Sequence, residues 1–229
     1  DIDIADTIVH TGDDNTKIRF PSTDTVSIET SGAEQLRITS DGAIIKGLSN
    51  TGRAQFFHSV VNPRVQIEGA GDFDRQVSLT SSASTANYGS VFILGRQRSG
   101  AVGGNTILQA GDSIGLISYQ GHDGTNFIEG SRIESIVETG VGANDMPVGL
   151  RFSTNNGTTS VGERLRITSA GRVGIGENSP DALLHLATGA STTCEIRLTS
   201  NNTGSGSGDR GRINVYSSLN NGTEYQAGY

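Results

Sequence analysis

The chain has 229 residues, of which Gly, Ser, Thr and Asn together make up 96. Hydrophobic residues reach only 33%, with one Cys, one Met and no Trp. No run approaches the roughly 18 apolar residues of a membrane-spanning helix, and a single Cys excludes an internal disulfide framework. The formal net charge is −7 with only two Lys, and phosphate neutralisation needs clustered basic residues. We therefore expect neither membrane insertion nor nucleic acid binding.

Apolar and polar residues alternate through the N-terminal part of the chain, at 16–20, 24–29 and 35–39. A period of two sends apolar side chains to one face, which predicts β-strands. Asp41-Gly42 is a turn signal, and the next residues to Gly47 predict a return strand. We predict an N-terminal β-hairpin module over residues 1–50.

The same alternation continues at 64–68, 132–136, 149–153 and 164–168, with turn signals at Asp123-Gly124 and Asn156-Gly157. The segment Glu34–Gly42 recurs, with two changes, as Glu163–Gly171. The repeat predicts a second hairpin, closed like the first by a two-residue turn that ends in Gly. We predict a central β-rich module over residues 51–186.

One segment, 179–184, has helix signals: Ser179 at the N-cap, Pro180 at the first position and Asp181 in the first turn. It predicts about one helical turn before a strand near residues 185–186.

The chain after residue 187 alternates again at 195–199 and 212–216, with a turn signal at Asn221-Gly222. Residues 195–200 weakly repeat residues 75–81. We interpret 187–229 as the start of a further β module that is truncated at Tyr229. The predicted fold class is all-β, with short antiparallel strands and hairpins arranged in modules.

Such a chain has little apolar surface to bury when it folds. Each predicted strand offers two or three apolar side chains, whereas ordering a residue costs roughly 1–2 kcal/mol. Burial returns about 25 cal/mol per Å² of apolar surface. A chain this poor in apolar residues meets that cost by burying strands against other copies of itself, which predicts an obligate oligomer.

Two stretches resemble modules of bacteriophage tail fibres, especially those of marine cyanophages. The first, residues 4–47, carries Ile8–Pro21 and the hairpin around Leu36-Arg37-Ile38. The second, residues 64–186, is similar over its later part. Its motifs are Gln109–Asp112, Gly121–Gly124, Asp145–Pro147, Arg151–Thr154, Glu163–Ile167, Val173–Gly176 and Ser179-Pro180.

The resemblance implies an elongated, intertwined homotrimer in a virion tail appendage that contacts the host surface. Its partners would be other virion tail proteins and a glycan or protein receptor. The two hairpins are then the predicted trimer core. That core comprises Leu36, Ile38, Leu165, Ile167, Val173 and Ile175. A tailspike-type enzyme that degrades surface polysaccharide is the alternative, and a bacterial surface adhesin is a weaker one.

We predict no catalytic, cofactor or metal residues. Gly174-Ile175-Gly176 lacks the third Gly of a dinucleotide loop, so we interpret these glycines as close chain packing near a trimer axis. The four His residues have no metal-ligand spacing. Cys194 is expected to be a buried free thiol rather than a nucleophile.

Receptor contact is predicted in the least regular part, residues 87–128. It holds two Gly-rich loops, at 99–104 and 121–124, and the aromatic residues Tyr88, Phe92, Tyr119 and Phe127. Loops on a rigid scaffold concentrate binding residues. The candidates are Tyr119, His122 and Asp123. The competing interpretation is that these loops merely turn and that the module is part of the fibre shaft.

Overall fold

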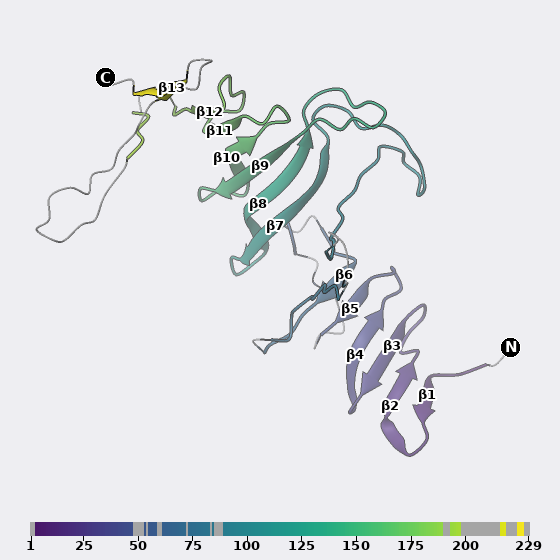
Figure 1. The fold of residues 1–229 in the computed structure, drawn as a ribbon. Helices are drawn as coiled ribbons and strands as arrows, with labels where there is room; N and C mark the ends of the chain where they lie inside the picture. Colours follow the sequence, from purple (N-terminus) through teal and green to yellow (C-terminus); the bar gives the residue numbers. More distant parts are fainter. Residues whose placement is uncertain are drawn as a thin grey trace, which may run out of the picture. The chain divides into compact units, whose positions relative to one another are not determined.

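The structure is a computed structural model of residues 1–229 (Figure 1). The residues that it describes are 3–47, 53, 55–58, 61–71, 73–82, 84, 89–189, 193–197, 216–218 and 224–226. They form fourteen β-strands and no helix, which confirms the all-β prediction for this part of the chain. The chain divides into two compact units, Asp1–His185 and Leu186–Tyr229.

The first sheet has six strands in chain order, β1 to β6. They are β1 (Thr7–His10), β2 (Asp13–Arg19), β3 (Val26–Thr30), β4 (Ala33–Ile38), β5 (Ile44–Lys46) and β6 (Val65–Ile67). The first five strands form an antiparallel meander, and β6 then pairs with β5 in parallel. This parallel pair departs from the predicted antiparallel pattern, because a long connection rather than a hairpin joins β5 to β6.

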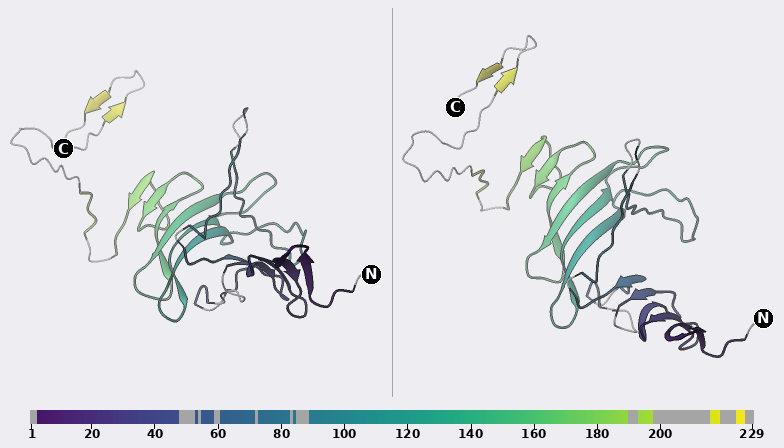
Figure 2. Two further views of the ribbon diagram at one scale, coloured as in Figure 1. Left: turned by 90° about the horizontal axis from the view of Figure 1, so that it is seen from below. Right: turned by 60° about the horizontal axis from the view of Figure 1, so that its bottom comes forward.

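The second sheet also has six strands in chain order, β7 to β12. They are β7 (Ser113–His122), β8 (Phe127–Val137), β9 (Val148–Asn155), β10 (Val161–Ile167), β11 (Val173–Ile175) and β12 (Leu184–Leu186). Adjacent strands from β7 to β11 are antiparallel. The long strands β7, β8 and β9 lie side by side as one curved layer (Figure 2).

The repeated sequence forms the same hairpin twice, β4–β5 and β10–β11. In the first, the Gly42 N–H donates to the Thr39 carbonyl at 2.8 Å, and the Thr39 N–H donates to the Ala43 carbonyl at 3.0 Å. In the second, Gly171 and Thr168 make the same two bonds, at 2.9 Å each. Gly42 and Gly171 have φ of 80° and 76°. The loop is therefore a three-residue one with Gly in the left-handed conformation, and the predicted two-residue turn was wrong.

The correspondence extends to the β-bulge beside each hairpin. In β3–β4 the register skips Gln35, between the pairs Ile28↔Leu36 and Glu29↔Glu34. In β9–β10 it skips Arg164, which occupies the matching place in the repeat. The two sheets thus share strand order, hairpin loop and bulge, so the repeat extends beyond the segment that the sequence comparison identified.

The predicted helical turn at 179–184 was wrong, because the sheet uses its carbonyl groups instead. The Leu183 carbonyl accepts the N–H of Val173 at 2.8 Å, and the Pro180 carbonyl accepts a bond from Arg172 Nη1 at 3.0 Å. The strand predicted after it is present as β12.

Three further strand-level predictions were wrong or lie outside the described residues. Residues 195–197 carry no strand, although the alternation at 195–199 predicted one, and residues 198 and 199 lie outside the described residues. Residues 87–128 were interpreted as irregular, yet they contain the ten-residue strand β7. In the second unit, β13 (Tyr216–Ser218) pairs antiparallel with β14 (Glu224–Gln226). The turn signal at Asn221-Gly222 falls outside the described residues.

Candidate functional site

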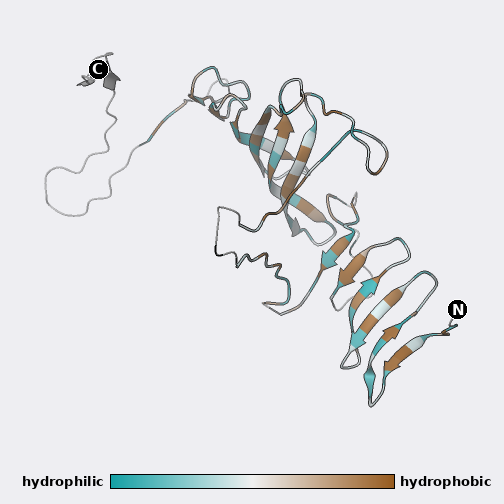
Figure 3. Cartoon of the chain, turned by 45° about the vertical axis from the view of Figure 1, so that its right-hand side comes forward, coloured by the Kyte–Doolittle hydropathy of each residue, from teal (hydrophilic) through white to brown (hydrophobic). Residues whose placement is uncertain are grey.

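Apolar residues alternate with polar ones along the strands of both sheets, as the brown and teal bands in Figure 3 show. The strand registers place apolar residues in rows on one face of each sheet. The register of the second sheet places five such residues in one row across five strands. They are Ile117, Ile133, Phe152, Leu165 and Ile175. A neighbouring row holds Leu150, Ile167 and Val173 on the same face.

The first sheet repeats this arrangement. Ile8, Ile18, Ile28 and Leu36 pair in register across β1 to β4 and form a continuous apolar row. A second row on the same face includes Val26, Ile38, Ile44 and Val65.

Nothing within the described chain buries these rows. Ile8 is 46% exposed, Ile38 is 45% exposed and Ile175 is 42% exposed. Among the described residues, only five hydrophobic side chains are buried: Ala43, Ile45, Leu108, Ile136 and Val137. The apolar side chains of these rows are therefore either exposed or half-buried.

All six predicted trimer-core residues lie on these two apolar faces. Leu36 and Ile38 lie on the first sheet, and the other four are paired across β10 and β11 of the second. Ile38, Ile167 and Ile175 are exposed in the single chain, and Leu36, Leu165 and Val173 are half-buried. Their assignment to a trimer core stays a prediction.

The opposite face of each sheet carries ion pairs. In both hairpins an Arg binds a Glu three residues earlier through two hydrogen bonds. Arg37 binds Glu34 at 2.7 and 2.5 Å, and Arg166 binds Glu163 at 2.6 and 2.9 Å. These hydrogen bonds raise the pKa of both guanidinium groups above the ordinary value, against a smaller opposing effect of burial.

The ion pairs continue along the second sheet. Arg151 Nε lies 3.3 Å from Glu163 Oε2, and Arg132 Nη2 lies 3.3 Å from Glu134 Oε2. Glu134 is buried, so its carboxylate needs the neighbouring guanidinium. The charges named here are therefore paired within the chain, although the buried Nε atoms of Arg132 and Arg151 have no hydrogen-bond partner among the described residues.

These pairs were not predicted, although the Glu-x-x-Arg spacing is present in both copies of the repeat. In a regular strand, residues three apart point to opposite faces. The bulge at Gln35, and at Arg164 in the second sheet, shifts the alternation by one residue. It therefore brings each Glu to the same face as its Arg.

The three predicted receptor residues do not form one cluster. Tyr119 is 54% exposed and follows Ile117 on the apolar face. His122 instead packs edge-on against Phe127, with ring centroids 5.0 Å apart. Asp123 is engaged by its own turn, since its Oδ1 accepts the N–H groups of Thr125 and Asn126 at 2.7 Å each.

The interpretation of Cys194 was wrong. Cys194 is exposed rather than buried, with its Sγ 3.6 Å from the Leu186 carbonyl oxygen. The close packing expected at Gly174 is present, because a Cβ there would lie 2.2 Å from the Glu177 carbonyl oxygen of its own chain. The position of Gly174 near a trimer axis stays a prediction.

Among the described residues, no three His, Cys, Asp or Glu side chains gather closely enough to hold a metal ion. In the same part of the chain, no helix has the length and apolarity needed to cross a membrane.

In the described part of the chain, four carboxyl groups have a pKa below their ordinary values: Asp6, Asp41, Glu68 and Asp123. In each case the largest cause is a hydrogen bond donated to the carboxylate. The donors are the Thr7 and Thr39 hydroxyls, the Arg53 guanidinium and the Asn126 N–H, respectively.

These lowered pKa values predict weak acid sensitivity. A carboxyl with a lower pKa in the folded state stabilises the fold fully above its unfolded-state value, about 4 to 4.5. That contribution is lost as the pH falls through the folded-state pKa. Because the groups are mostly exposed, we expect a decrease of only a few degrees in Tm between pH 7 and pH 3. Differential scanning calorimetry measures this decrease, and an increase in Tm on acidification would contradict it.

Comparison with solved structures finds the same kind of fold in a bacteriophage tail fibre. The carboxy-terminal domain of the bacteriophage T5 L-shaped tail fibre matches with a TM-score of 0.53 and 13% identity. The match covers 85% of this chain and 83% of that domain. A structure of the same domain with its intra-molecular chaperone domain matches with a TM-score of 0.52 and 12% identity, over 94% of this chain and 67% of that one.

No family model matches the sequence, and no curated protein matches it. The fold is therefore similar to that of the carboxy-terminal domain of this tail fibre.

Proposed function

We propose that this chain is a structural and adhesive segment of a virion tail fibre, which takes part in attachment to the host cell surface. The supporting observation is the pair of apolar faces that the single chain leaves open, on a fold similar to a tail-fibre domain. The sequence motifs favour marine cyanophages as the source. The partners are other virion tail proteins and a glycan or protein receptor.

We propose an intertwined homotrimer as the assembled form. Each copy contributes the apolar rows of both sheets, and Leu36, Ile38, Leu165, Ile167, Val173 and Ile175 form part of the core. A shared core of this kind explains why so few apolar side chains are buried within one chain.

The proposed role is not enzymatic. A polysaccharide-degrading tailspike would be favoured by a long right-handed β-helix with a carboxylate-lined groove. The two described six-stranded sheets are instead meanders built mostly from antiparallel pairs. The similar solved structures are of a tail-fibre domain.

The attachment role is tested on virions that carry the chain. Antibodies raised against the purified chain should label the tail appendages in electron micrographs. Purified assembled chain, added in excess, should reduce virion adsorption at least tenfold, because it occupies the same receptors. Labelling of the capsid alone would contradict the tail location, and unchanged adsorption in the presence of excess chain would contradict the attachment role.

A further inference from the structure

A pocket of about 570 Å³ lies beside the first sheet, within the first compact unit. Its walls come from the segment 53–75, which includes β6, and from the ends of β7 and β8 that flank their turn. The Phe127 N–H donates to the Gln55 carbonyl at 2.8 Å, and the His58 N–H donates to the Phe127 carbonyl at 3.1 Å. Backbone hydrogen bonds therefore hold the two walls together.

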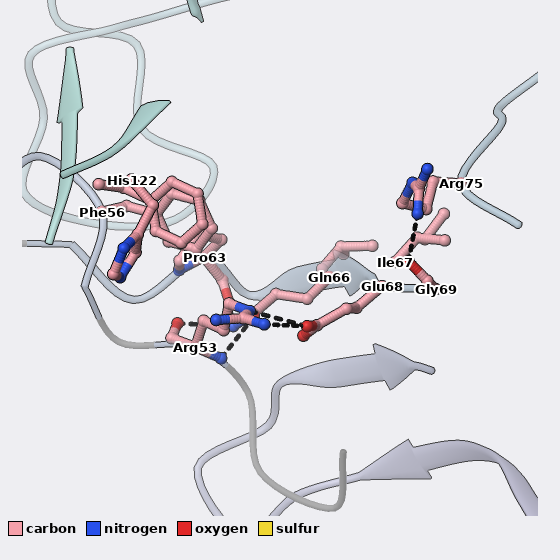
Figure 4. Close-up of a pocket in the computed structure, with 11 residues that line it drawn as sticks. Arg53, Phe56, Pro63, Gln66, Ile67, Glu68, Gly69, Arg75 and His122 are labelled. Atoms are coloured by element: carbon pink, nitrogen blue, oxygen red, sulfur yellow. Dashed lines mark hydrogen bonds and ion pairs between the residues drawn. The ribbon is translucent and has the colours of Figure 1, made fainter. Parts of the chain in front are cut away.

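One end of the pocket is an aromatic cluster. Phe56 and Phe127 stack with centroids 4.7 Å apart at an interplanar angle of 16°, and His122 packs edge-on against Phe127. Figure 4 shows Phe56 and His122 together at this end. Aromatic and apolar walls of this kind bind the C–H faces of a sugar ring, which water solvates poorly.

Polar groups are fixed in the middle of the pocket. Arg53 Nε donates to Glu68 Oε1 at 2.9 Å. Gln66 accepts the Arg53 N–H at 2.7 Å and donates to the Arg53 carbonyl at 3.2 Å. Gln66 is thus a positioning residue, because it holds the backbone that carries the guanidinium.

His122 lines the pocket, and its Nδ1 accepts the N–H of Gly124 at 3.0 Å. A neutral imidazole whose Nδ1 accepts a hydrogen bond carries its proton on Nε2. In this tautomer the Nε2–H is the imidazole donor that a ligand oxygen would use.

The pocket lining contains two guanidinium groups, those of Arg53 and Arg75, and one carboxylate. Glu68 is the carboxylate in its lining and is paired with Arg53. Arg75, at the other end in Figure 4, donates to the Gly69 carbonyl, and no carboxylate among the described residues pairs with it. Guanidinium groups bind carboxylates through paired N–H donors, so Arg75 favours an anionic group at this end.

We propose that this pocket binds an acidic saccharide unit of a cell-surface polysaccharide. The sugar ring packs against Phe56 and Phe127, its hydroxyls bond His122 and Glu68, and its carboxylate pairs with Arg75. The inference deepens the proposed attachment function and rests on it. It locates receptor contact in a pocket where His122 is present and from which Tyr119 and Asp123 are absent.

The test uses the purified assembled chain on an array of bacterial capsular oligosaccharides that contain glucuronic or galacturonic acid. Each glycan is printed beside its carboxyl-reduced counterpart. We expect Arg75→Gln to weaken binding to the acidic glycans about tenfold, the loss typical of one charge-assisted hydrogen bond. Carboxyl reduction should weaken wild-type binding by a similar factor but barely affect Arg75→Gln, because the two changes remove the same contact.

His122→Ala should weaken binding to both members of each glycan pair. Arg164→Gln is the matched control, because it removes the same charge from an exposed site outside the pocket. Native mass and circular dichroism establish that each variant remains folded and assembled. Absence of binding to every acidic glycan overturns the inference, as does equal loss of binding in Arg75→Gln and Arg164→Gln.

Adsorption of whole virions, measured in parallel, separates the inference from the proposed function. If excess chain blocks adsorption but Arg75→Gln blocks it equally well, the pocket is not the receptor site and the attachment function stands. If the array shows Arg75-dependent binding and excess chain does not block adsorption, the pocket stands and the attachment function falls.

Discussion

Replacing Ile167 by Asp is expected to abolish assembly and leave a species near the 23.9 kDa mass of one chain. Ile167 is paired with Leu150 and Val173 in an apolar row, and it is 39% exposed in the single chain. In the proposed trimer, an Asp there buries an unpaired carboxylate in each copy, at a cost of several kcal/mol per chain. Sedimentation velocity measures the result directly, since the wild type should sediment at three times the chain mass.

Leu165→Asp, in the neighbouring row, should behave in the same way. Arg164→Asp is the matched control, because Arg164 is exposed at the bulge and lies outside the apolar rows. It should assemble normally. A normal trimer yield from Ile167→Asp would show that this face is in contact with water and would remove the basis for the proposed core.

The strands and hairpins could be predicted from local pattern alone. Period-two alternation identified β4 and β10, and the repeat showed that both continue into the same hairpin. These features depend on neighbouring residues, so a single sequence contains them. The same alternation places the six predicted trimer-core residues on the apolar faces, where three are exposed and three are half-buried in the single chain.

The features that could not be predicted from the sequence depend on contacts between residues that are far apart in the chain. The β-bulge that brings Glu163 and Arg166 to the same face shifts the register of β10 against β9. The residue types at this position do not predict a bulge. The local signals at Ser179 and Pro180 favour a helical turn. In the structure, the carbonyl groups of Leu183 and Pro180 instead accept hydrogen bonds from Val173 and Arg172.

The pocket is the clearest case of this limit. Arg53 and Phe127 are far apart in the sequence, yet the guanidinium lies 5.8 Å from the ring centroid. The alternation on either side carries no information about that approach. His122 could be named from its turn, whereas its partners required the tertiary structure.

Gly174→Ala is expected to destabilise the second sheet by about 2–3 kcal/mol per chain, as overpacking at a tight site does. The added Cβ would lie 2.2 Å from the Glu177 carbonyl oxygen, which is backbone and has no rotamer by which to move away. The equivalent position in the first sheet holds Ile45, which is buried at 5% exposure. The repeat alone would therefore suggest that a side chain is tolerated at 174, and the close approach of Glu177 predicts the opposite.

Thermal unfolding followed by circular dichroism tests this expectation, with Gly162→Ala as the control on the neighbouring strand. At Gly162 the nearest atom to an added Cβ is the tip of the Arg164 side chain, at 3.7 Å. That substitution should change stability by less than about 0.5 kcal/mol. If Gly174→Ala unfolds at the same temperature as Gly162→Ala, the loop at residue 177 can move aside. Packing within the chain would then not require Gly at position 174. A decrease in stability that is seen only in Gly174→Ala would mean that the glycine is needed for packing within one sheet rather than for contact between copies.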